Sequence, residues 1–169
     1  EKLVEYIEDS EGSSLNCRSD VIRHVSNKMK VYETLKKLGL KTPETVLLDK
    51  DETIKNISQL TKDLGYPMIF KPLDGVGCDG LSIVKDENEI VKAVKKIIRE
   101  SLSKQFIAQN CVKGKAASAC VISNGNKALS ITLNRQFVTL VSPNEKSRYH
   151  GGIVPFEHKL EVKALKAAE

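Results

Sequence analysis

Tryptophan is absent from the sequence, and aromatic residues make up only 5% of its 169 positions. Proteins that hold single-stranded nucleic acid stack its bases on aromatic side chains, so such a platform is not expected here. The net charge of +5 allows an anionic partner, but many lysines, such as Lys92, Lys95 and Lys96, lie along helix-like segments. That spacing is typical of solvated helix faces. We therefore expect no nucleic-acid partner.

Long apolar runs are also missing, because none approaches the ~20 residues that a membrane-spanning helix needs. Residues 1–6 are too charged for a signal peptide. The four cysteines form no C-x-x-C pair and have no histidine at a spacing suited to zinc. We expect no membrane segment and no metal site within the chain, and free thiols in a reducing cytoplasm.

One stretch stands out among what is present. The apolar residues 66–70 lead into Lys71-Pro72, a glycine-rich stretch follows at 73–80, and apolar residues resume at 81–84. Pro72 cannot donate to a strand ladder, so the first strand of this hairpin is expected to stop beside Lys71. The glycines let backbone N–H groups approach an anion without obstruction by a Cβ atom. The pattern favours a loop that binds polyphosphate, with Lys71 at its entrance.

Other interpretations of this stretch stay open on glycine spacing alone. It can be an ordinary glycine-rich hairpin with Lys71 as a solvated end residue. It is not the G-x-G-x-x-G of a Rossmann unit, because the loop returns into a strand, and it lacks the G-K-S or G-K-T step of a P-loop. Cys78 lies in the loop with no base nearby in sequence, so we interpret it as a small loop residue rather than a nucleophile.

The residues before the hairpin predict helices. A helix ends near residue 7, and residues 20–25 form a short helical or irregular approach. Ser26 is expected to cap the next helix and Gly39 to end it. Lys28 then falls in the first helical turn, where a cation opposes the helix dipole. This placement is tolerable if Lys28 faces an anion, although an exposed helix lysine explains the residue equally simply.

The remaining pattern predicts an α+β fold, either with one core or with two small lobes around a cleft. One lobe is expected to contain a strand at 45–48, a helix at 54–64, the hairpin and a second helix. The apolar face of this second helix consists of Ile90, Val91, Val94, Ile97 and Ile98. A strand at 106–110 follows. Residues 116–122 and 127–134 flank Asn124-Gly125, which predicts a type I′ hairpin. We expect another antiparallel strand at 136–140, a loop at 141–156, and a final helix from Glu157.

In this order the pieces resemble the ATP-grasp superfamily. The matching stretches are Asn27-Lys28 at a helix start, residues 38–45, residues 66–72 with the glycine loop, and residues 106–114. The resemblance implies an ATP-grasp-like fold that holds a nucleotide between two lobes. It divides the chain into a helical connector at 1–42, a small lid lobe at 43–111, and an incomplete antiparallel-sheet lobe at 112–169.

The resemblance also implies ATP as a ligand. Lys28 and Lys71 match the lysines that contact its phosphates, and Asn110 and Val112 match the hinge pair that reads the adenine edge. The full implied nucleotide-binding set is Lys28, Lys71, Gly75, Gly77, Cys78, Gly80, Gln109, Asn110, Cys111 and Val112. Gln109 stands where the family often has glutamate. Ala116 stands where many members have an acid for the ribose, which leaves the partner of the sugar unassigned.

Members of the family bind magnesium with a late acidic residue and a Glu-x-Asn element. No Glu-x-Asn follows Asn134, so we expect a fragment, inactive alone, whose Mg²⁺ ligands lie outside this chain. Arg148 is the candidate catalytic residue, suited by its fork to a transferring phosphate or a substrate carboxylate, and a solvated loop arginine is the alternative. The stretch 148–157 is most similar to archaeal carboxylate–amine ligases, among them tyramine–glutamate ligases.

The implied reaction joins a carboxylate to an amine. ATP phosphorylates the carboxylate, and the amine attacks the acylphosphate. The expected partners are small-molecule carboxylate and amine substrates, and a homo-oligomer is compatible with the resemblance. Three alternatives stay open: a nucleotide-binding module without catalysis, a basic nucleic-acid-binding domain, and an ATP-grasp acid–thiol ligase or carboxylase.

Overall fold

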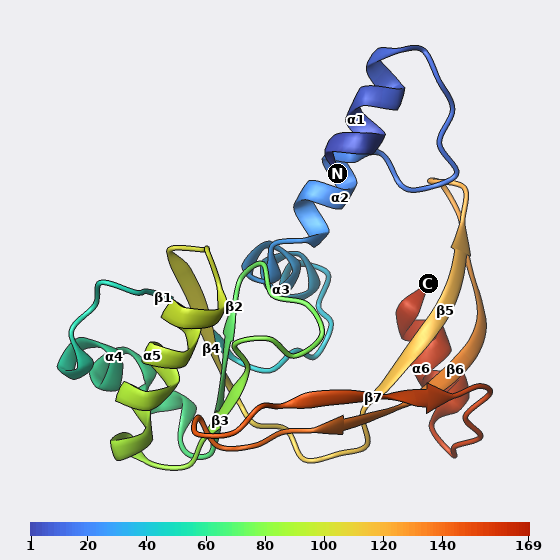
Figure 1. Ribbon diagram of the computed structural model, residues 1–169. Helices are drawn as coiled ribbons and strands as arrows, with labels where there is room; N and C mark the ends of the chain where they lie inside the picture. Colours follow the sequence, from blue (N-terminus) through green and yellow to red (C-terminus); the bar gives the residue numbers. More distant parts are fainter.

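The computed structural model describes residues 1–169, which form two antiparallel sheets and the helices around them (Figure 1). In chain order the elements are α1 (Lys2–Asp9), α2 (Ser19–Val25), α3 (Lys28–Lys37), β1 (Thr45–Asp49), α4 (Ile54–Thr61), η1 (Lys62–Leu64), β2 (Met68–Pro72), β3 (Ser82–Val84), η2 (Glu87–Glu89), α5 (Ile90–Glu100), β4 (Gln105–Asn110), β5 (Ala117–Ser123), β6 (Ala128–Thr139), β7 (Arg148–Ile153) and α6 (Glu161–Ala168). No helix is both long and apolar enough to span a membrane.

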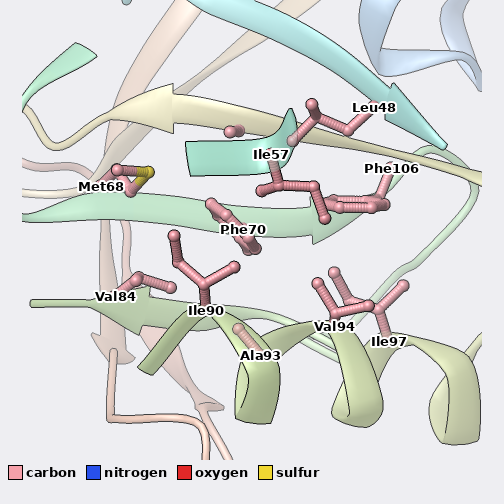
Figure 2. Packing of buried hydrophobic residues seen from close by; sticks show 11 residues of the cluster. Leu48, Ile57, Met68, Phe70, Val84, Ile90, Ala93, Val94, Ile97 and Phe106 are labelled. Atoms are coloured by element: carbon pink, nitrogen blue, oxygen red, sulfur yellow. The ribbon is translucent and has the colours of Figure 1, made fainter. Parts of the chain in front are cut away.

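The first sheet has the strand order β1-β4-β2-β3, with antiparallel neighbours throughout. The predicted hairpin is therefore confirmed as β2 and β3. Helices α4 and α5 cover one face of this sheet, and the hydrophobic core lies between them and the strands (Figure 2). Phe70 and Phe106 form its centre, with ring centroids 5.4 Å apart. The core fixes β2, and with it the start of the glycine loop.

Alternation along β2 decides which way its lysine points. Met68 and Phe70 are buried in the core, so Ile69 and Lys71 lie on the opposite face of the sheet, because successive side chains of a strand alternate. Lys71 pairs across the sheet with Ile107. The strand runs one residue past Lys71, through Pro72.

The buried face of α5 differs from the prediction. Val91 is 37% exposed and Ile98 is 53% exposed, whereas Lys96 is only 2% exposed. Val91 and Ile98 therefore lie on the outer side of the helix, and Ala93 and Lys96 lie on its buried side. Assigning Lys96 to a solvated face was therefore wrong. The apolar face was predicted from the positions of hydrophobic residues alone. That pattern does not reveal that a lysine can be buried when carbonyl groups elsewhere in the chain accept its hydrogen bonds.

The second sheet has the order β5-β6-β7 and is also antiparallel. Strand β6 continues unbroken to Thr139, so the separate strand predicted at 136–140 is wrong. The third strand is β7, which lies inside the stretch predicted to be a loop. Its segment Tyr149-His150-Gly151-Gly152 has no apolar alternation, and pairing with β6 makes it a strand. The β6–β7 turn reaches back to β3 of the first sheet (Figure 1).

Three local predictions also need correction. Asn27, not Ser26, caps α3, because its side chain accepts hydrogen bonds from Met29 N at 3.0 Å and Lys30 N at 3.1 Å. The Asn124-Gly125 turn is not type I′, since Gly125 has positive φ and Asn124 does not. The Asn124 side chain instead accepts from the N–H groups of the two residues after Gly125. The last helix begins at Glu161 rather than Glu157.

Candidate functional site

Lys28 contacts the glycine loop directly. The Asn27 cap places it as the first residue of α3, and its Nζ donates to the carbonyl oxygens of Leu73 at 3.0 Å and Gly75 at 2.6 Å. Burial lowers the pKa of Lys28, and the nearby Asp74 carboxylate offsets part of this effect. An ammonium group has three donors, so Lys28 can hold the loop and keep one N–H for an anion.

Lys71 lies on the same side of the sheet as α3. Burial lowers the pKa of Lys71, and the positive charge of Lys28 lowers it further. Two cations that repel each other in a partly desolvated position are stabilised by an anion between them. The two lysines, 43 positions apart in the sequence, thus form one positively charged locus.

A pocket of about 300 Å³ contains both lysines. One wall is α3, with Val31, Tyr32 and Leu35, and the floor is the sheet face that carries Lys71, Ile107 and Gln109. Three of the residues predicted for the nucleotide site, Lys28, Lys71 and Gln109, are therefore brought together. The hinge residues 110–112 do not line this pocket.

The glycine loop has little room for side chains. A Cβ atom on Gly75 would lie 2.7 Å from Pro72 Cγ and 3.1 Å from the Asp79 carbonyl oxygen. Gly80 has φ +68°, and a Cβ atom there would lie 3.0 Å from the same proline ring. Cys78 has φ 73° although it is not glycine. Burial and Asp79 raise the pKa of the Cys78 thiol against the opposing effect of Lys96, which does not favour a thiolate nucleophile.

The C-terminal end of α5 anchors this loop at two points. Gly80 N donates to Glu100 Oε2 at 2.9 Å, and Ser101 Oγ donates to Asp74 Oδ1 at 2.9 Å. Burial acts to raise the pKa of Glu100, but Arg99 and the Gly80 N–H outweigh it, so the net pKa is lowered. Sequence reasoning missed both anchors. An acid at a helix C-terminus, where the dipole disfavours it, was the available signal for Glu100.

The end of β4 carries the predicted hinge. Asn110 N donates to the Glu44 carbonyl at 3.1 Å, and Cys111 N donates to the Pro67 carbonyl at 3.2 Å. The hydrogen bonds outside the regular elements include none to the Asn110 carbonyl and none from the Val112 N–H. The Asn110 Oδ1 atom is buried without a hydrogen-bond partner. Gln109 instead uses its side chain to donate to Thr45 Oγ1 at 2.7 Å.

Arg148 is the exposed first residue of β7 and does not line the lysine pocket. His150, two residues on, shares a 2.9 Å hydrogen bond with Thr139 on β6. No group of three or more His, Cys, Asp or Glu side chains is arranged to hold a metal ion. These side chains therefore do not form a metal site made of protein ligands alone.

Comparison with known proteins gives the family. The model of a family described as an ATP-grasp domain matches residues 25–169. The chain belongs to the ATP-grasp family. The predicted α+β fold is confirmed, and the residues that carried the resemblance all lie within the matched range.

Among its relatives, an uncharacterized protein of Methanocaldococcus jannaschii is 34% identical over 139 residues, which cover 80% of this chain and 30% of that protein. A D-alanine–D-alanine ligase of Bacillus anthracis is 27% identical over 66% of this chain and 33% of its own length. The chain thus spans about a third of these relatives. Related ATP-grasp proteins include ATP-dependent ligases that act on small molecules.

Solved ATP-grasp structures share the fold. The VanG D-Ala:D-Ser ligase of Enterococcus faecalis superposes with a TM-score of 0.84 at 13% identity, over 98% of this chain and 49% of that one. The Bacillus anthracis D-alanine–D-alanine ligase in complex with ATP gives a TM-score of 0.71 at 20% identity, over 98% of this chain and 51% of that one. At these identities the likeness establishes the fold alone.

Proposed function

We propose that this chain is the ATP-binding part of a ligase that joins a carboxylate to an amine through an acylphosphate. The observation that carries the proposal is the convergence of Lys28 and Lys71 on one pocket beside the glycine loop. Two partly desolvated cations and a glycine-rich backbone suit a polyphosphate better than a single carboxylate, because several anionic oxygens can be bonded at once.

The phosphates and the adenine of the nucleotide have proposed partners. Lys28 and Lys71 neutralise phosphate charge, and the loop with Gly75, Gly77, Cys78 and Gly80 covers the phosphates. The Asn110 carbonyl and the Val112 N–H read the adenine edge. Neither group takes part in a backbone hydrogen bond outside the regular helices and strands. Gln109 completes the pocket beside Lys71.

The reaction needs positioning and charge neutralisation more than a side-chain nucleophile. A carboxylate oxygen attacks the terminal phosphorus and ADP leaves, after which the amine attacks the acyl carbon and phosphate leaves. Arg148 is proposed to hold the transferring phosphate or the substrate carboxylate.

The substrates proposed first are glutamate as the acid and tyramine as the amine. This choice rests on the stretch 148–157, and the 34% identity to a Methanocaldococcus jannaschii protein supports an archaeal branch. Acid and amine pairs are screened for ADP release with the full-length protein that carries this chain. Hydroxylamine in place of the amine should trap the acylphosphate as a hydroxamate.

The outcomes of this screen separate three readings. ADP release that requires the acid and yields hydroxamate is the expected result. ADP release that requires a thiol in place of the amine, or bicarbonate in place of the carboxylate substrate, would move the protein to the thiol-ligase or carboxylase class. ATP binding without turnover for any pair would identify a nucleotide-binding module.

A further inference from the structure

Lys96 is a buried cation that does not line the pocket of Lys28 and Lys71. It lies on α5 and is 2% exposed, whereas Lys92 and Lys95 on the same helix are exposed. A charged amine leaves water at a high cost unless polar partners replace it. Burial lowers the pKa of Lys96, and the Glu100 carboxylate offsets part of that effect. A lysine kept in such a position is expected to have a specific set of acceptors.

Its acceptors come from two different lobes. Lys96 Nζ donates to the Leu81 carbonyl at 2.8 Å and to the Glu145 carbonyl at 2.7 Å. Leu81 follows directly after the glycine loop. Glu145 lies in the turn between β6 and β7, which belongs to the second sheet. A single ammonium group therefore joins the exit of the glycine loop to the second sheet.

The surrounding contacts make this junction a docking point for the β6–β7 turn, residues 140–147. Ile83 N, at the free edge of β3, donates to the Val141 carbonyl at 2.9 Å. Ser147 is fully buried, and its Oγ accepts from Val141 N at 3.2 Å, which closes the turn on itself. The ion pair between Lys146 and Asp79 spans 3.3 Å but both side chains are more than half exposed, so it contributes little.

The junction sits between two groups of the proposed active site. Arg148 follows the turn directly, as the first residue of β7. On the other side, Leu81 follows Gly80, whose N–H is held by Glu100. The two carbonyls that Lys96 binds are thus one residue after Gly80 and three residues before Arg148. Figure 1 shows the β6–β7 turn beside β3 at the point where the two sheets approach.

We propose that Lys96 is a positioning residue that clamps the β6–β7 turn to the lid lobe and so sets where Arg148 lies relative to the glycine loop. The clamp itself stands on geometry alone, and its effect on turnover rests on the proposed ligase function. Lys96 does not line the pocket of Lys28 and Lys71, so its removal should change the chemical step more than ATP affinity.

Hydrogen exchange read by mass spectrometry tests the clamp. The variant is Lys96→Met, which keeps the length of the side chain and removes its charge, and the matched control is Lys95→Met on the exposed side of the same helix. Lys96→Met should speed exchange in residues 141–147 by about tenfold or more, because both hydrogen bonds that the ammonium donates are lost. Exchange in α5 should not speed up, since an apolar side chain suits the buried position.

A purely structural lysine would give the opposite pattern, with faster exchange in α5 and unchanged exchange at 141–147, and that result would overturn the proposal. If Lys96→Met does not fold, Lys96→Gln keeps a polar side chain at the buried position and removes the ammonium that donates to Leu81 and Glu145. It should speed exchange at 141–147 in the same direction. Unchanged exchange there in Lys96→Gln would equally count against the clamp.

The functional consequence is measured in the full-length protein. Lys96→Met should lower kcat by about 10- to 100-fold, as expected for a misplaced reacting group, and leave the KM for ATP within about threefold. A large rise in KM with unchanged kcat would contradict the positioning role. If the parent shows no ligase turnover, the proposed function fails, while the exchange measurement still decides whether Lys96 clamps the turn.

Discussion

At the scale of single residues, the proposed ATP site contains two lysines whose positive charge is costly in the free protein. Burial lowers the pKa of both Lys28 and Lys71, and the charge of Lys28 adds to the effect on Lys71. The ammonium group of Lys28 donates hydrogen bonds to two carbonyl groups of the loop, which offsets part of this cost. Lys71 has no side-chain hydrogen bond of this kind. Stability and ligand binding therefore make opposite demands on Lys71.

Replacing Lys71 by methionine separates these demands. Lys71→Met should weaken ATP binding by about 1–3 kcal/mol, because a charge-assisted contact to phosphate is lost. The same change should leave the free energy of unfolding unchanged or raise it, since a buried repulsion disappears. Calorimetry and urea denaturation measure the two effects. A destabilised variant with unchanged ATP affinity would assign Lys71 to the structure of the sheet instead.

The lowered pKa values also predict a pH dependence. Phosphate groups are fully ionised well above pH 6, so further change at alkaline pH comes from the protein. ATP should bind the charged lysines and raise their pKa, so affinity should fall with rising pH before the ordinary lysine range is reached. Binding in that window should take up protons, which titrations in buffers of different ionisation enthalpy detect. Affinity that is constant between pH 7 and pH 10 would contradict this account.

Stability should change in the other direction over the same window. In the free protein, Lys28 and Lys71 lose protons at a lower pH than in the unfolded chain. Between those two pH values the unfolded state binds more protons, so these two groups make the free energy of unfolding rise with pH. As the pH rises through this window, ATP affinity should therefore fall while the contribution of the two lysines to the free energy of unfolding rises.

At the scale of elements, the glycine loop is a rigidly anchored structure rather than a loose connection. Helix α5 holds it through Glu100 and Ser101, and α3 holds it through Lys28. Its backbone also passes through the left-handed region at Gly80. The loop position is therefore set by helices on both sides of the sheet.

Substituting Gly80 tests this rigidity. Gly80→Ala should cost about 1–2 kcal/mol of stability, because φ +68° is unfavourable for an L-residue and its Cβ atom would press on Pro72. Cys78→Ser is the matched control in the same loop, with an expected change within about 0.5 kcal/mol. Urea denaturation measures both. Equal stabilities for Gly80→Ala and the parent chain would mean that the loop adapts freely.

The sequence could predict those elements whose signals are local. The strand that carries Lys71, the hairpin around the glycine loop and the helix that begins at Lys28 depend on short-range patterns, and all are present, although the strand runs one residue past Lys71. Ser26 and Asn27 are both good helix caps, so propensity could not choose between adjacent positions. Strand β7 carries two glycines and forms through its pairing with β6. Burial of Lys96 depends on carbonyls 15 and 49 positions away, which no local pattern reveals.

At the scale of the whole molecule, the proposed site lies where two sheets meet, and the two sheets differ in how much hydrophobic core stabilises them. The first has a compact core between the strands and helices α4 and α5, whereas Leu133 is the buried hydrophobic residue of the second. The proposed site residues lie on both: the lysines and the glycine loop belong with the first sheet and Arg148 with the second. In this proposal, the hydrogen bonds of Lys96 to Leu81 and Glu145 hold the two parts of the site together.

The central claim is that Lys28 and Lys71 bind the phosphates of ATP, and calorimetric titration of the chain with ATP tests it most directly. The comparison is between the Lys28→Ala/Lys71→Ala variant and a control variant, Lys92→Ala/Lys95→Ala, which removes the same charge from the exposed side of α5. We predict that the control binds ATP like the parent chain and that the pocket variant does not bind. Equal ATP affinity in the two variants would contradict the claim.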